Sequence, residues 1–285
     1  MPELRYHRYT YLGILLLLAA VPAFGQVTLA PTFVYVDEPA RYGTVQLTNA
    51  SDQVQEVFID FEFGYPTADE SGQRYLEYDD ADTEADHSLS PWIRSFPERF
   101  RIPPKHRRTI RLMIDAPEDL SGDMYWTRMV VTSREEVPPG SEKGPAQIHF
   151  EFKQVIPVVF ERGSASTDVA ITDLFVDAQP RHVTLVAAVD RTGEAPFFGS
   201  IDLSLMNEEG TEVARRSTTT EAYYAASTYF TIDREALPAG RYLADVTLRA
   251  ERNDVRKGDV PAMRPVTRRF VVHVPEPVPL STRSR

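Results

Sequence analysis

Short runs in which apolar and polar residues alternate recur along most of the chain. Examples are "GTVQLTN", "EVFIDFEF", "RTIRLMID", "HVTLVAAVD" and "RYLADVTLRA". Successive side chains of a β-strand point to opposite faces, so this two-residue period indicates half-buried strands. Turn residues separate the runs, and the 3.6-residue period of an amphipathic helix is almost absent. The pattern predicts an all-β protein.

The number of runs predicts two domains. Roughly a dozen runs exceed the seven or so strands of one immunoglobulin-like (Ig-like) β-sandwich and suit two in tandem. A small, polar segment, "RGSAST" at 162–167, lies between the two groups. We therefore predict a first Ig-like domain over 26–162 and a second over 163–275. In each, a Tyr follows a Leu by five residues before a strand, at Tyr125 and Tyr242, as in the tyrosine corner of Ig-like domains.

The first domain has an acidic insertion at residues 66–90. The spacing from a shared turn to the corner Tyr is longer in the first half than in the second by the length of this segment. It holds eight acidic residues and one Arg. The run "DDADTEAD" suggests calcium, but Ala85 stands where the turn of an EF-hand loop needs Gly. We expect a solvated acidic loop.

The two ends of the chain are expected to lie outside the domains. Residues 1–25 combine a basic start, the apolar run "YLGILLLLAAV" and small residues at Ala23 and Gly25, which is typical of a secretory signal peptide. The run is too short for a membrane helix, so no membrane span is expected in the mature form. The chain has no Cys, so an exported form would depend on core burial for stability. Residues 276–285 are expected to form a disordered tail.

Charge and motifs narrow the function. The formal net charge of -11 argues against a nucleic-acid binder. The common catalytic and nucleotide-binding motifs are missing, and the six His are scattered without metal-ligand spacing. A catalytic triad assembled from distant residues would leave no such motif. We predict no enzyme, no cofactor and no metal site.

One stretch runs against the acidic charge, "FRIPPKHRRTIRLMI" at 100–114. Ile110, Leu112 and Ile114 alternate with Arg111 and Met113, as in a strand with one buried face. We interpret the cations as a solvent-facing row that balances the charge of the insertion, and not as a ligand site.

The last strand of the first domain is the candidate functional element. In "PAQIHFEFKQVIPVVFERG", at 145–163, Ile148, Phe150 and Phe152 lie on one face by the two-residue period. Pro157 cannot donate a backbone hydrogen bond, so an edge or a bulge is expected there. An exposed edge can add a strand from a partner. The alternative is that the three apolar residues are ordinary core.

The chain resembles the PapD-like periplasmic pilus-assembly chaperones. The resemblance runs through "VTLAPTFVYV", "GTVQLTNAS" and "FRIPPKHRRTIRL", and it is sharpest at "REEVPPGSEKGPAQIHFEF", residues 134–152. The second domain matches in architecture alone. The resemblance implies two Ig-like sandwiches set in an L. It also implies a periplasmic protein that binds exported pilus or fimbrial subunits, with an outer-membrane usher as a possible further partner.

The resemblance also implies roles for individual residues. Ile148, Phe150 and Phe152 would complete an incomplete subunit, and Lys153 is the possible anchor for its terminal carboxylate. Phe33 stands about where the family has an anchoring Arg, which is a departure from its pattern. Arg162 and Asp123 would form the interdomain salt bridge. The alternative is a structural or adhesive Ig-like module that has lost the carboxylate anchor. The sequence leaves open the client, the oligomeric state and the role of the insertion.

Overall fold

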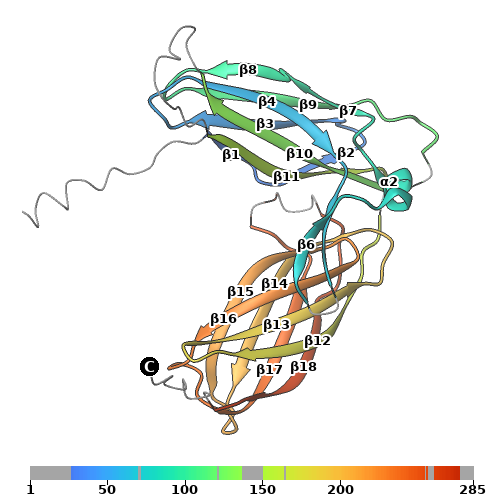
Figure 1. The fold of residues 1–285 in the computed structure, drawn as a ribbon. Helices are drawn as coiled ribbons and strands as arrows, with labels where there is room; N and C mark the ends of the chain where they lie inside the picture. Colours follow the sequence, from blue (N-terminus) through green and yellow to red (C-terminus); the bar gives the residue numbers. More distant parts are fainter. Residues whose placement is uncertain are drawn as a thin grey trace, which may run out of the picture.

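The structure is a computed structural model that describes residues 27–69, 72–120, 122–136, 150–163, 165–253, 255 and 260–276. Two β-sandwiches follow one another along the chain, with their strands running at a large angle to each other (Figure 1). The all-β prediction and the two sandwiches are confirmed. The expected signal peptide and most of the expected tail lie outside the described residues.

The first sandwich consists of two sheets. The four-stranded sheet has the order β1 (Val27–Ala30), β3 (Tyr42–Asn49), β9 (Arg107–Ile114), β7 (Ile93–Phe96). The five-stranded sheet has the order β2 (Val34–Asp37), β11 (Glu151–Glu161), β10 (Met124–Glu135), β4 (Gln55–Glu62), β8 (Arg99–Ile102). The inner faces of both sheets form one core.

The second sandwich begins after a short linker. A three-stranded sheet has the order β12 (Val169–Ala178), β13 (His182–Arg191), β16 (Ala225–Asp233). The facing sheet has the order β15 (Glu212–Ala222), β14 (Phe197–Met206), β17 (Gly240–Arg249), β18 (Val266–Val274). Its buried residues form a separate core.

Both tyrosine corners are present. At the first, the hydroxyl oxygen of Tyr125 accepts a hydrogen bond from the backbone N–H of Gly122 at 2.8 Å. At the second, the hydroxyl of Tyr242 donates to the carbonyl of Pro238 at 2.9 Å. Each Tyr lies near the start of a central strand, β10 or β17, and fixes the loop that enters it. The corner predicted from the Leu-to-Tyr spacing is therefore confirmed in both sandwiches.

The expected acidic loop is wrong in its secondary structure, although most of its described acids are exposed to solvent as expected. The segment forms a hairpin of β5 (Tyr65–Ala68) and β6 (Arg74–Glu77), followed by helix α2 (Ala81–His87). The helix begins where the Asp80 side chain accepts from the backbone N–H of Thr83 at 3.1 Å, an N-cap contact. The hairpin extends from the first sandwich along the second, beside β16 (Figure 1). Tyr65, at the start of the hairpin, is 5% exposed and packs into the buried cluster between the sandwiches, whereas Tyr75 and Tyr78 among the acids are exposed.

The inward face of the basic stretch is confirmed, but its charge partners are not those expected. Ile110 and Leu112 are fully buried on β9, and Arg111 and Met113 point outward. The ion pairs of the cations around this stretch connect Arg101 to Glu136 at 2.8 Å and Lys105 to Asp52 at 3.0 Å. These acids lie in or beside the first sandwich and outside residues 66–90. The expected balance with the insertion is wrong because neighbouring strands and turns bring other acids closer.

Candidate functional site

Over part of its length, strand β11 has a strand neighbour on one side only among the residues that the structure describes. It pairs with β10 along its whole length, from Glu151 opposite Arg134 to Glu161 opposite Met124. On the other side, β2 covers it in parallel register along Val158–Glu161 alone. Among the residues that the structure describes, the segment 151–157 thus has a strand neighbour on one side. This agrees with the edge expected around Pro157.

Two aromatic side chains mark the start of this edge. Phe150 is 67% exposed and Phe152 is half-buried, and their rings stack with centroids 6.3 Å apart. By strand periodicity they share a face with Ile156, which is buried in the core. The exposure of this face therefore changes along the strand. It is buried in the core at Ile156 and carries exposed aromatic side chains at the other end. The third residue of the predicted set, Ile148, lies outside the described residues.

Lys153 lies on the opposite face of β11 and is exposed. Five residues separate it from Val158, which is paired with Val34. At about 3.3 Å per residue, that is roughly 17 Å along the strand. Because β2 runs parallel to β11, Phe33 lies one residue nearer, and Lys153 is about 13 Å from its level along the strand. The structure does not bring the two anchor positions together.

Phe33 is part of a closed aromatic joint between the sandwiches. The side chain is 3% exposed. Its ring packs edge-on against Phe198 of the second sandwich at 5.0 Å, and the guanidinium of Arg252 lies 4.6 Å from the ring centroid. The buried members of this joint are Phe33, Phe63, Tyr65, Met124, Trp126, Val159, Ala165, Ala195, Phe198 and Tyr223. An aromatic ring thus stands where the resemblance implied a cationic side chain, with the guanidinium of Arg252 against it.

The joint also contains a buried cation that the sequence analysis missed. The side chain of Arg128, on β10, is 4% exposed, and its Nε donates to the carbonyl of Gly64 at 3.0 Å. Nη1 lies 3.9 Å from Oε1 of Glu221, at the end of β15 in the second sandwich. The guanidinium carbon lies 5.2 Å from the ring centroid of Tyr223. An Arg as the one charged residue within the run "YWTRMVV" was the available signal.

Arg162 does not make the expected pair with the Asp123 carboxylate. Its guanidinium bonds to Glu38 Oε1 at 3.2 Å and to the carbonyls of Glu118 and Leu120, each at 2.7 Å. Asp123 contributes its backbone carbonyl, which accepts the Arg162 N–H at 2.8 Å. All of these partners belong to the first sandwich. The ion pair that connects the two sandwiches near this point is Arg128 with Glu221.

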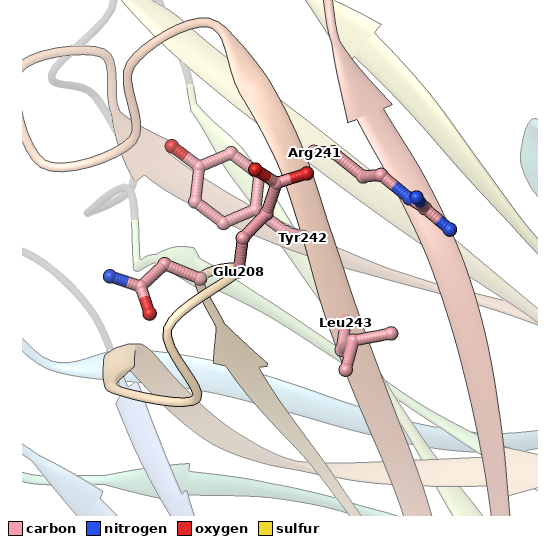
Figure 2. A pocket seen from close by; sticks show the side chains of 5 residues that line it. Glu208, Arg241, Tyr242 and Leu243 are labelled. Carbon is pink, nitrogen blue, oxygen red and sulfur yellow. The ribbon is translucent and has the colours of Figure 1, made fainter.

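Other features do not form a competing site. A surface hollow lined by Asn207, Glu208, Arg241, Tyr242 and Leu243 lies on the second sandwich, where the β14–β15 turn meets the start of β17 (Figure 2). The hydroxyl of Tyr242, which lines this hollow, already donates a hydrogen bond to Pro238 in the tyrosine corner. Within the described part of the chain, there is no cluster of three or more metal-ligating side chains. Nor does that part include a helix with the length and apolar character needed to cross a membrane.

Comparisons with known proteins find matches among solved structures. No protein-family model matches the sequence, and no curated protein matches it. Solved pilus chaperones match most of the chain. The archaic chaperone–usher CsuC–CsuE chaperone–tip adhesin complex of Acinetobacter baumannii matches with 11% identity and a TM-score of 0.41, over 88% of this chain and 99% of that one.

Two further structures match to the same degree. The Pseudomonas aeruginosa CupB2 chaperone has 9% identity and a TM-score of 0.43, over 87% of this chain and 100% of that one. The Salmonella enterica SafB chaperone complex with SafA pilin has 12% identity and a TM-score of 0.41, over 86% of this chain and 97% of that one.

Proposed function

We propose that this protein is a periplasmic chaperone that binds an exported, β-structured subunit by adding a strand at the free edge of β11. One observation carries the proposal. The edge from Glu151 to Pro157 lacks a second strand neighbour among the described residues, and the stacked pair Phe150 and Phe152 lies at its start. Unpaired backbone groups supply affinity in strand addition, and alternate side chains supply specificity.

The pattern of side chains supports a client that offers an apolar groove. Phe150 and Phe152 present two rings on one face, and the residues between and after them, Glu151 and Lys153, are charged and exposed on the other. A client with an incomplete sandwich could bury the two rings in the gap of its own core. Residues 1–25 support export, and pilus or fimbrial subunits with their usher are the partners that we propose.

The closed joint favours a second candidate, a structural Ig-like module. Phe33 and Phe198 fill the space between the sandwiches, and Lys153 lies far from them along β11. A module of this kind would keep the two sandwiches and bind no subunit through β11. The two candidates differ in whether changes at Phe150 and Phe152 affect binding.

Co-purification from the periplasm tests the proposal. The triple variant with Ile148, Phe150 and Phe152 changed to Asp should lose a partner that the unchanged protein retains. A matched control changes Val271→Asp, because Val271 is a comparably exposed apolar residue, at 57%, on β18 of the second sandwich. The control should keep the partner. A partner that stays on the triple variant would show that β11 is not the binding strand.

A further inference from the structure

The hairpin–helix insertion (Tyr65–His87) contacts both sandwiches. At its tip, the carbonyl of Gly72 accepts a hydrogen bond from the hydroxyl of Tyr229 on β16. A Cβ at Gly72 would lie 3.4 Å from both Ser227 Oγ and Val186 Cγ1. The backbone φ of Gly72 is +81°, which favours Gly. The tip of the hairpin therefore lies directly on the outer face of the second sandwich.

The surface under the tip is an apolar row. Val186 on β13 lies between Phe175 on β12 and Tyr229 on β16 in the strand register. Val186 is 9% exposed, whereas Phe175 is 46% exposed and Tyr229 is 42% exposed. On an outward sheet face, a buried Val next to half-exposed aromatics means that something covers it. The hairpin tip, in contact with Val186, supplies the cover.

The base of the insertion is fastened to the joint. Tyr65 stacks on Tyr223 of the second sandwich with ring centroids 6.0 Å apart. Its hydroxyl donates to Asp80 Oδ2 at 2.5 Å, and the same carboxylate accepts from the Thr83 hydroxyl at 2.6 Å. Asp80 thus connects the hairpin to the first turn of α2.

The helix completes the connection on both sides. The hydroxyl of Thr83 accepts a hydrogen bond from the Tyr224 hydroxyl of the second sandwich at 3.4 Å. At the other end of the helix, the His87 ring stacks on Trp126 of the first sandwich at 4.5 Å. The helix therefore contacts both sandwiches.

From these contacts we propose that the hairpin–helix insertion is a brace that holds the two sandwiches at one fixed angle. The aromatic joint and the Arg128–Glu221 pair form a single hinge region, and a hinge alone permits rotation about it. The hairpin tip contacts the second sandwich away from that region, on the outer face of β13 and β16. A second, separate contact removes the rotation. This role does not depend on the proposed function.

The distance distribution between two spin labels tests the brace. The chain has no Cys, so Gln46→Cys and Arg216→Cys provide one label site in each sandwich, both exposed. Electron–electron double resonance on the full chain should give one narrow distribution. Replacing residues 67–75 with Asn-Gly keeps a two-residue hairpin turn and removes the tip. We expect that variant to broaden the distribution at least twofold.

A second variant changes the other side of the contact. Tyr229→Ala leaves the insertion intact and removes the tip's hydrogen bond, and it should also broaden the distribution. Phe175→Ala is the matched control, since it removes a similarly exposed ring from the same row, two strands from Tyr229. Circular dichroism verifies that each variant is folded. If the shortened hairpin prevents folding, the distance distribution of Tyr229→Ala tests the brace by itself. Wild-type distributions in the folded variants, or equal broadening in Phe175→Ala, would overturn the proposal.

Discussion

Changing Arg128 to Met should destabilise the joint strongly. The guanidinium is almost fully buried and faces Glu221, whose side chain is 19% exposed. Removing one member of a buried ion pair costs about 3–5 kcal/mol, because the other charge remains without its partner. The separation of 3.9 Å and the partial exposure of Glu221 favour the lower end, about 3 kcal/mol. Loss of the hydrogen bond to the Gly64 carbonyl adds about 1 kcal/mol.

We therefore expect a loss of about 4 kcal/mol for Arg128→Met. Glu221→Leu should cost about 3 kcal/mol, because it leaves the Arg128 charge uncompensated and keeps the hydrogen bond to Gly64. The double change Arg128→Met with Glu221→Leu should recover most of the loss, since apolar residues of similar volume often replace a buried pair at little cost. The double-mutant cycle isolates the pairwise contribution from the effects of each truncation.

Urea unfolding provides the measurement. The chain has two Trp, and Trp126 lies in the joint, so its fluorescence in a Trp92→Phe background reports on that region. Far-ultraviolet circular dichroism reports on both sandwiches, and agreement between the two probes tests for a single transition. A loss below about 1 kcal/mol for Arg128→Met would refute the reasoning. So would a double variant whose loss equals the sum of the two single losses.

Three further predictions concern other parts of the chain. Burial lowers the pKa of His87, and the charge of Arg191 lowers it further, whereas the Met124 carbonyl and Asp86 raise it. As the pH falls, His87 is therefore protonated in the unfolded chain before it is protonated in the folded protein. The stability that the neutral ring contributes is present above about pH 6.5 and is lost as the pH falls below it. His87→Phe keeps a ring on Trp126 and should lose less Tm than wild type between pH 7.5 and pH 5, and an equal loss would contradict the assignment. Leu112→Ala should lower the free energy of unfolding by about 2–5 kcal/mol, measured in urea, because it opens a cavity at a fully buried position. Changing the exposed Arg107 and Arg108 to Ser should shift that free energy by about 0.5 kcal/mol or less, and a shift above 2 kcal/mol would show that these cations are structural.

The strands could be predicted from the sequence because their signal is local. Each two-residue alternation depends on the burial of one face, as on β9, where Ile110 and Leu112 are buried and Arg111 is exposed. The tyrosine corners were also predictable, since Tyr125 and Tyr242 bond to residues three and four positions earlier. Features that depend on contacts between residues close together in the chain can be predicted from the local sequence pattern.

The joint was not predictable for the opposite reason. Arg128 and Glu221 are far apart in the chain, and either one alone resembles an ordinary charged residue on a strand. The acids of the insertion indicated solvation, and most of those described are exposed, but they gave no sign that Tyr65 determines where the segment packs. Arg162 binds Glu38 of its own sandwich and no acid of the second sandwich among the described residues. Contacts of this kind depend on how two sandwiches meet, which strand periodicity does not encode.

The contrast between the joint and the β11 edge explains why the edge is the better candidate for binding. In the joint, apolar side chains from both sandwiches already bury one another, so a partner would have to separate them first. At Phe150 and Phe152, the apolar rings are exposed or half-buried beside backbone without a second strand neighbour in the described chain. Such an edge promotes aggregation unless charges or a partner cover it. The exposed Glu151 and Lys153 oppose uncontrolled pairing, and burying the two rings requires a partner with a groove of matching shape.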